Sequence, residues 1–296
     1  MLARVWGCRG SIASPGPATV RYGGNTSCVE LRLPDNSVAI LDAGTGIRTL
    51  GAQLVADDVR VIHIMLSHLH LDHLQGLAFF APLYRSEVEL HLWGPPSPIR
   101  TLADRVAAYM SDPLFPVNLA DVPCQLIPHD APMDGVEMGG SMVWAAPVTH
   151  QGPTVGYRVE EGDATFAYIP DHEPALGNIQ LTTADRAWIS GIELADGVDV
   201  LLHDAQYTSE EYADHVGWGH SSIEHVVEFA ITADVKQLVL FHHDPAHADD
   251  DLESIRTRAI GLWGDRPNPP LVAHEGMEIP VGSFTIPDPT TSAQTI

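Results

Sequence analysis

Short apolar runs recur along the chain, and several of them end in glycine, aspartate or histidine. They are rich in β-branched residues and too short for helices, so they predict buried strands. The predicted strands span residues 28–33, 38–41, 59–66, 88–92, 141–145, 165–169, 198–202 and 237–241.

Segments with helical periodicity lie between these runs. They span residues 47–56, 98–110, 209–215, 221–232 and 250–262. The segment that begins at Ser221 places Glu224 three residues later, which predicts a capping box at the start of that helix. Strands in two sets with helices interspersed predict two sheets packed face to face and covered by helices.

Composition narrows the class of protein. With 296 residues, 45% apolar content and no clear linker, residues 1–280 are expected to form one domain. Residues 281–296 are rich in proline, threonine and serine, so we expect a flexible C-terminal tail there. No apolar run approaches the roughly 18–20 residues of a membrane-spanning helix, and the first residues lack the features of a signal peptide. The three scattered cysteines predict reduced thiols in a cytoplasmic protein.

The charge is strongly acidic. Lysine plus arginine number 15 against 39 aspartates and glutamates, a formal net charge of −24, and Lys236 is the only lysine. Such a surface repels polyanions, and no basic run offers a local exception, so long nucleic acid is disfavoured as a partner. A solvated acidic face suited to solubility or a salty cytoplasm is the favoured explanation of the charge.

The segment that ends at His73 carries the clearest chemical signal. An apolar strand runs into His68, His70, Asp72 and His73, four side chains of the metal-ligand type within six residues. In an extended chain residues two apart face the same way, so His68 and His70 can hold one cation together. Asp72 and His73 lie where the chain leaves the strand and can turn toward a second cation. Imidazole and carboxylate suit Zn²⁺, Mn²⁺ or Fe²⁺.

Two cations of four or five ligands each, joined by a water, need about seven protein ligands, so about three more are required. His150, Asp171 and His242 each follow a predicted strand, and a carboxylate at Asp171 can bridge both cations. His243 and Asp244 adjoin His242, which leaves the identity of the last ligand open between His242 and His243.

The His-x-His-x-Asp-His motif resembles the hallmark of the metallo-β-lactamase superfamily, and the resemblance covers nearly the whole chain. It implies an α/β fold, the αββα sandwich of two mixed sheets flanked by helices. It also implies two divalent metal ions, Zn²⁺ foremost with Mn²⁺ or Fe²⁺ as alternatives. The implied ligands are His68, His70 and His150 for one ion and Asp72, His73 and His242 for the other, with Asp171 as the bridge. Asp42 would orient a ligand histidine, although a role in capping the helix 47–56 stays open.

Two further elements resemble the phosphodiesterase branch of this superfamily, which includes tRNA 3′-processing endonucleases and phosphoribosyl cyclic phosphodiesterases. They are His-Asp-Ala-Gln at 203–206 and Gly-His-Ser-Ser at 219–222. In that branch a carboxylate orients a histidine that protonates the departing alkoxide, so Asp204 takes the first role and His220 the second. We therefore predict a dinuclear metal-dependent phosphodiesterase, with hydroxide as nucleophile and with His220, Asp204 and Asp72 as its catalytic residues.

The spacing of two predicted ligands bears on the substrate. Many of the endonucleases insert a long RNA-clasping arm between the third metal histidine and the bridging aspartate. Only 20 residues separate His150 from Asp171, and residues 160–163 predict a hairpin there. With the net charge, this favours a small phosphodiester such as a cyclic nucleotide or a phosphoribosyl cyclic phosphate. A lactonase or thioesterase on the same scaffold and a non-catalytic binding or sensory protein are the alternatives. No membrane partner is expected, and a homodimer is left open.

Overall fold

The computed structural model describes residues 1–174 and 180–282. Most of the predicted C-terminal tail, residues 283–296, lies outside the described residues, so the division at residue 280 stays a prediction. Val281 still donates its backbone N–H to the carbonyl of Met1, at 3.0 Å. None of the helices within the described ranges is long and apolar enough to cross a membrane.

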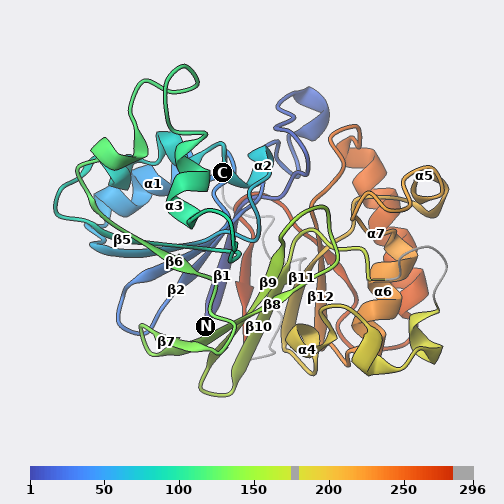
Figure 1. The fold of residues 1–296 in the computed structure, drawn as a ribbon. Coiled ribbons are helices and arrows are strands. Elements are labelled where there is room, and N and C mark those ends of the chain that lie inside the picture. Colours follow the sequence, from blue (N-terminus) through green and yellow to red (C-terminus); the bar gives the residue numbers. More distant parts are fainter. Residues whose placement is uncertain (175–179, 283–296) are drawn as a thin grey trace, which may run out of the picture.

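Two seven-stranded sheets make up the centre of the described structure (Figure 1). The first has the strand order β14-β1-β2-β3-β4-β5-β6, and the second β13-β12-β11-β10-β9-β8-β7. The first sheet consists of β1 (Leu2–Gly7), β2 (Cys28–Arg32), β3 (Val38–Leu41), β4 (Val61–Met65), β5 (Glu89–Gly94), β6 (Gln125–Asp130) and β14 (Glu278–Pro280). The second consists of β7 (Val136–Met138), β8 (Ser141–Pro147), β9 (Val155–Glu161), β10 (Ala164–Ile169), β11 (Val200–Asp204), β12 (Gln237–Phe241) and β13 (Leu271–Val272).

Both sheets are mixed. Strands β3 to β6 run parallel, as do β10 to β13, whereas the remaining neighbours pair antiparallel. Because parallel strands end at the same edge of a sheet, residues that follow β10, β11 and β12 are brought together there.

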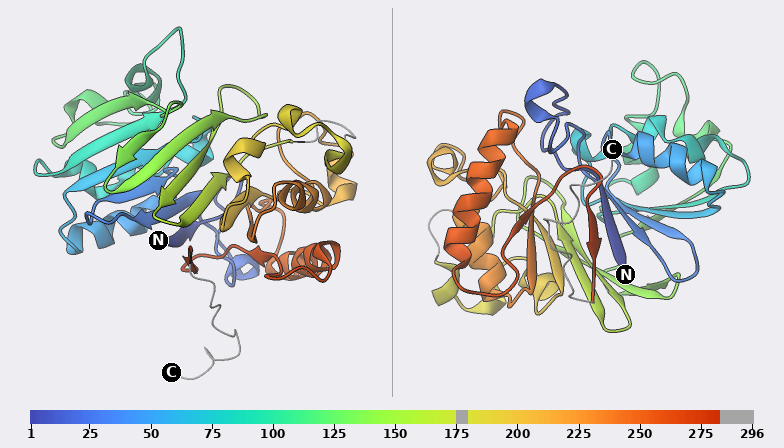
Figure 2. Two further views of the ribbon diagram at one scale, coloured as in Figure 1. Left: turned by 90° about the horizontal axis from the view of Figure 1, so that it is seen from below. Right: turned by 180° about the vertical axis from the view of Figure 1, so that it is seen from behind.

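Helices cover the outer face of each sheet (Figure 2). The helices beside the first sheet are α1 (Ile47–Ala56), α2 (Leu71–Leu74) and α3 (Leu102–Ala107). Those beside the second are α4 (Ile192–Ala195), α5 (Ser209–Tyr212), α6 (Ile223–Thr232) and α7 (Asp249–Trp263).

Three apolar layers follow from the alternation of side chains along the strands. Ile62 and Ile64 of β4 face outward and pack with Leu50 of α1, whereas Met65 faces the second sheet and joins the layer that contains Phe166. A third layer lies between the second sheet and helices α6 and α7. The αββα sandwich predicted from the sequence is therefore confirmed.

The helix predicted over residues 98–110 is shorter in the structure. It spans Leu102–Ala107, and Thr101 caps it by accepting a hydrogen bond from the backbone N–H of Asp104, at 3.1 Å. Pro98 stands at the start of the predicted span, and proline in a helix interior removes a backbone donor and clashes with the preceding turn.

The predicted capping box at Ser221 is wrong. The N-cap of α6 is Ser222, whose hydroxyl accepts from the backbone N–H of His225, at 3.2 Å. Ser221 instead donates its hydroxyl to the carbonyl of His172, at 2.7 Å, and Glu224 accepts from Arg258. A capping box does occur one helix earlier, at α5.

The predicted hairpin between His150 and Asp171 is confirmed. Strands β9 and β10 pair antiparallel with Glu161 opposite Ala164, and Gly162 takes a φ of 58° in the turn between them. The segment between the two predicted ligands is therefore filled by a short hairpin of the second sheet.

Candidate metal centre

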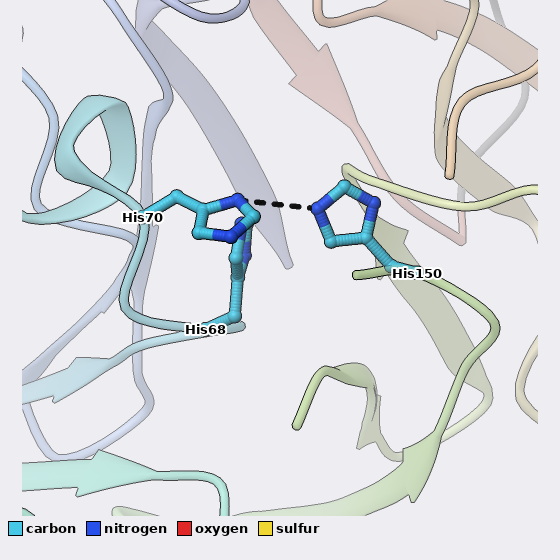
Figure 3. A group of neighbouring side chains, drawn as sticks. All are labelled: His68, His70 and His150. Atoms are coloured by element: carbon cyan, nitrogen blue, oxygen red, sulfur yellow. Dashed lines mark hydrogen bonds between the residues drawn. The ribbon is translucent and has the colours of Figure 1, made fainter. Parts of the chain in front are cut away.

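Three histidines from two loops face one another at the rim of the sandwich (Figure 3). His68 and His70 lie between β4 and α2, and His150 follows β8. Each offers a ring nitrogen, and these three atoms all lie within 4.8 Å of one another. The dashed line in the figure joins Nδ1 of His70 to Nε2 of His150, 3.3 Å apart.

A second group lies beside the first and is more deeply buried. Asp72, His73 and His242 offer one oxygen and two nitrogens within the same 4.8 Å limit. Asp72 and His73 stand in the first turn of α2, for which His70 is the N-cap. His242 comes from the other sheet, directly after β12.

Asp171 lies between the two groups and presents one carboxylate oxygen to each. Its Oδ1 lies 3.0 Å from Nε2 of His73 and 3.3 Å from Nε2 of His242. Its Oδ2 lies 3.7 Å from Nε2 of His68 and 3.5 Å from Nε2 of His150. This is the position of a carboxylate that can bridge two cations.

The histidines are oriented by hydrogen bonds on the ring nitrogen that faces away from the cluster. Nδ1 of His73 donates to Asp42 at 2.7 Å, and Nδ1 of His150 donates to the carbonyl of Gly219 at 2.7 Å. Nδ1 of His68 lies 3.0 Å from the hydroxyl of Ser67. Each bond leaves Nε2 directed toward the centre, the arrangement in which surrounding groups fix the orientation of metal-binding imidazoles.

Asp42 serves the cluster and does not cap the neighbouring helix. It adopts a left-handed φ of 63° at the end of β3, and its carboxylate accepts hydrogen bonds from Ser67, His73 and Tyr168. The N-cap of α1 is Gly46, without a side-chain hydrogen bond. Of the two roles open for Asp42 in the sequence, the structure shows the orienting one.

His242 belongs to the cluster, and His243 does not. His242 takes a φ of 58°, which directs its Nε2 toward Asp72 and its Nδ1 toward the side-chain oxygen of Gln206, at 3.0 Å. Nε2 of His243 instead donates to the carbonyl of Ala273 at 2.8 Å, and burial lowers the pKa of His243 to about 3. Gly10 allows His242 this position, because a Cβ there would lie 2.5 Å from the imidazole.

The donor set fits divalent cations. Nε2 of His68 is buried and has no hydrogen-bond partner among the described residues, and Oδ1 of Asp171 makes no well-aligned hydrogen bond with them although Nε2 of His73 lies close by. A buried polar atom without a partner is costly, and a cation between these atoms would remove that cost. Imidazole nitrogens and carboxylate oxygens in this number are ligands for Zn²⁺, Mn²⁺ or Fe²⁺.

The predicted acid and its carboxylate partner lie next to both groups. Nδ1 of His220 lies 2.7 Å from Oδ2 of Asp204, and the ring of His220 is 5.0 Å from the rings of both His150 and His242. Burial lowers the pKa of His220, but the charge and hydrogen bond of Asp204 and the charge of Asp171 outweigh it and raise the pKa to about 9. The contact with Asp204 therefore favours the charged form of His220.

Asp72, the third predicted catalytic residue, lies inside the second group. Its Oδ2 accepts the backbone N–H of Ser11 at 2.7 Å and faces Nε2 of His242 at 3.2 Å. Burial alone would raise the pKa of Asp72, but the charges of His73 and His242 and their hydrogen bonds hold it well below its usual range. Asp72 therefore offers a carboxylate oxygen to the second group, beside the ring nitrogens of His73 and His242.

Four residues around the cluster are not evident from the sequence: Ser67, Tyr168, Glu173 and Gln206. Ser67 adjoins the motif that begins at His68, and Gln206 is the last residue of the recognised motif 203–206, although the sequence predicts no role for either. Glu173 is buried, and it accepts hydrogen bonds from Tyr212, Gly217 and Gly219, about forty residues further along the chain. No local pattern predicts such a contact.

The chain matches one protein family and several known proteins. The family described as "Beta-lactamase superfamily domain" matches residues 39–243. Ribonuclease Z from Mycobacterium sp. (strain KMS) is 29% identical over 266 residues, which cover 82% of this chain and 83% of that protein. Ribonuclease Z from Azobacteroides pseudotrichonymphae genomovar. CFP2 is 25% identical over 276 residues, with 83% and 89% covered.

Two solved structures share the fold. The metallo-β-lactamase fold protein YhfI from Bacillus subtilis has a TM-score of 0.66 and 17% identity, with 94% of this chain and 99% of that chain covered. The short form of human tRNase Z has a TM-score of 0.64 and 19% identity, with 95% and 99% covered.

Proposed function

This chain belongs to the β-lactamase superfamily, in its phosphodiesterase branch, and we propose that it hydrolyses a small phosphodiester with His220 as the general acid. Membership of this family indicates that the protein is a metal-dependent hydrolase. The observation that carries the proposal is the Asp204–His220 pair, 2.7 Å apart and next to both ligand groups. Hydrolysis of a thioester releases a weakly basic thiolate and does not need a residue that protonates a departing alkoxide.

We assign the two ligand groups to two divalent cations, with Zn²⁺ as the first choice and Mn²⁺ or Fe²⁺ as alternatives. His68, His70 and His150 would hold one and Asp72, His73 and His242 the other, with Asp171 between them. Bound there, the cations would supply positive charge that polarises the phosphoryl group and activates water.

The remaining chemistry belongs to the chain itself. Asp204 accepts from Nδ1 of His220, which fixes the ring and stabilises its charged form, so that Nε2 carries the proton to be transferred. The leaving oxygen of an alkyl phosphodiester is a strong base, and a proton donor beside it lowers the barrier to its departure. The backbone N–H groups of His172 and Ser221 donate to Asp204 and hold that carboxylate in place.

Two features of the protein support a small substrate. The β9–β10 hairpin fills the segment between His150 and Asp171, and the net charge is −24. Both features favour a cyclic nucleotide or a phosphoribosyl cyclic phosphate over a long polyanion. The second candidate is the 3′ end of precursor tRNA, which the relatives named ribonuclease Z support.

The location and assembly of the protein are further proposals. All three cysteines are buried and unpaired, which supports a cytoplasmic location. A homodimer is proposed as the alternative to a monomer, and light scattering of the purified protein distinguishes the two.

The test compares the wild type and His220→Ala after loading with each metal, with His274→Ala at an exposed histidine as the control. We expect 2′,3′-cyclic AMP or a phosphoribosyl cyclic phosphate to be hydrolysed, and His220→Ala to lose about 100-fold or more in kcat. Full phosphodiester activity in His220→Ala contradicts the proposed acid. If precursor tRNA is the preferred substrate, the second candidate holds. If a lactone or thioester is preferred, the protein is another kind of hydrolase. If the fully metallated protein is inactive on all of them, it is a binding protein.

A further inference from the structure

Glu173 lies two residues beyond Asp171, and its carboxylate is buried at the base of a loop. Oε1 accepts a hydrogen bond from the hydroxyl of Tyr212 at 2.7 Å and from the backbone N–H of Gly217 at 2.8 Å. Oε2 accepts from the backbone N–H of Gly219 at 2.7 Å. Three donors from one stretch of chain therefore converge on one side chain.

The loop held by Glu173, residues 213–219, touches the candidate metal centre at two points. The carbonyl of Gly219 accepts from Nδ1 of His150, and the carbonyl of Gly217 accepts from the side chain of Gln151. His220 is the next residue along the chain. The position of this loop therefore sets both the orientation of His150 and the start of the segment that presents His220.

Turn hydrogen bonds satisfy the N–H groups of Asp214, His215 and Trp218, whereas those of Gly217 and Gly219 donate to Glu173. Gly217 and Gly219 take φ values of 84° and 90°, a left-handed region that glycine adopts without steric cost. A Cβ on Gly219 would lie 2.4 Å from Nδ1 of His150, so the backbone packs directly on the imidazole. A loop of this kind keeps one conformation only when other groups satisfy its backbone N–H groups.

Glu173 is itself anchored on the opposite side. Its backbone N–H donates to the carbonyl of Thr149 at 2.9 Å, next to His150. The preceding residue, His172, donates its N–H to Asp204 and accepts the hydroxyl of Ser221. Residues 171–173 thus link three parts of the site. Asp171 belongs to the cluster, His172 binds Asp204, which orients His220, and Glu173 binds the loop that leads to His220.

We propose that Glu173 is a positioning residue that fixes loop 213–219 and thereby places His220 beside the departing oxygen of the substrate. The inference rests on the proposed function, in which His220 is the general acid. The carboxylate of Glu173 acts through the N–H groups of Gly217 and Gly219.

Glu173→Gln is the sharpest substitution. An amide keeps the shape of the carboxylate but has one oxygen, so at least one of the three converging donors must face an NH₂ group. Two donors that face each other cannot bond, and the loop should move or become mobile. Glu210→Gln makes the same chemical change at an exposed position of α5 and is the matched control. Tyr212→Phe removes one donor and leaves both loop N–H contacts.

Two phosphodiesters with different leaving groups measure the effect on His220. Bis(4-nitrophenyl) phosphate releases a stable phenolate that needs little protonation, whereas 2′,3′-cyclic AMP releases an alkoxide. We expect Glu173→Gln to lose about 10- to 100-fold in kcat on the cyclic nucleotide but only about threefold on the aryl diester, because general-acid catalysis matters for the first alone. Glu210→Gln and Tyr212→Phe should leave the ratio of the two activities unchanged.

Hydrogen exchange supplies a readout that does not depend on activity. Backbone N–H groups of residues 213–220 should exchange faster in Glu173→Gln than in the wild type when both are held at saturating Zn²⁺ and carry equal metal per chain by elemental analysis. Unchanged exchange, or an equal loss on both substrates, overturns the positioning role. If His220→Ala loses the same factor in kcat on both substrates, the proposed general acid is wrong. If His220→Ala loses more on the cyclic nucleotide but Glu173→Gln does not, only the inference about Glu173 is wrong.

Discussion

Single buried side chains determine how the candidate metal centre is arranged. The motif from His68 to His73 is readable in the sequence because its ligands are separated by a few residues along one strand end and one helical turn. Gln206 and Glu173 escape prediction because their partners lie 36 and about forty residues away, and only the folded loops bring them together. The uncertainty between His242 and His243 has the same origin, since the φ of His242 depends on its packing against Gly10.

Asp42→Asn tests the best-connected of these residues. The carboxylate of Asp42 accepts from Ser67, His73 and Tyr168, and an asparagine would place an NH₂ group against at least one of these donors. We expect a loss of about 1–3 kcal/mol in the free energy of unfolding from the unsatisfied buried groups. The affinity of the Asp72, His73 and His242 group for Zn²⁺ should fall by about 10- to 100-fold, because His73 loses its orienting partner.

Urea unfolding of the metal-free protein and a competitive zinc titration measure these two effects separately. Asp58→Asn is the control, since Asp58 is exposed and pairs with arginines at the surface. Normal zinc affinity at both groups in the Asp42→Asn variant would show that the Asp42 contact has no part in holding the metal.

At the scale of elements, regular packing is predictable and the ends of helices are less so. The helix 47–56 and the strands 38–41 and 237–241 have the predicted bounds. The helix has apolar residues at helical spacing on one buried face, and the two strands, apart from Gln237, are apolar throughout because both of their faces are buried. The start of α6 differs, because two adjacent serines compete for the N-cap and tertiary contacts decide between them. Ser221 is drawn to the carbonyl of His172, which no helix rule takes into account.

Ser222→Ala should destabilise the protein through the loss of a helix cap alone. The hydroxyl of Ser222 accepts the N–H of His225, and removal of an N-cap costs about 1 kcal/mol. Ser254→Ala on the exposed face of α7 should change the free energy of unfolding by less than about 0.5 kcal/mol. Chemical denaturation of the two variants gives the comparison, and equal stabilities would mean that Ser222 does not cap α6.

At the scale of the whole molecule, the candidate centre joins the two halves of the sandwich. His68, His70, Asp72 and His73 come from the first sheet, whereas His150, Asp171 and His242 come from the second. Cations bound between them would link the sheets at one edge, in addition to the apolar layer that packs them face to face. Removal of metal should therefore weaken the whole fold and not only the catalytic site.

We expect chelation to lower the Tm of the protein and two equivalents of Zn²⁺ per chain to restore it. A ligand at 1,000 times its Kd that binds only the folded state contributes about 4 kcal/mol, so the shift in Tm should amount to several degrees. His150→Ala and His242→Ala each remove a ligand from one group, and each variant should retain one tightly bound cation by elemental analysis. Because both groups span the two sheets, either variant should also show a smaller stabilisation by zinc than the wild type. An apo protein with the Tm of the loaded protein would mean that the cations contribute nothing to the union of the sheets, and that the apolar layer alone holds them together.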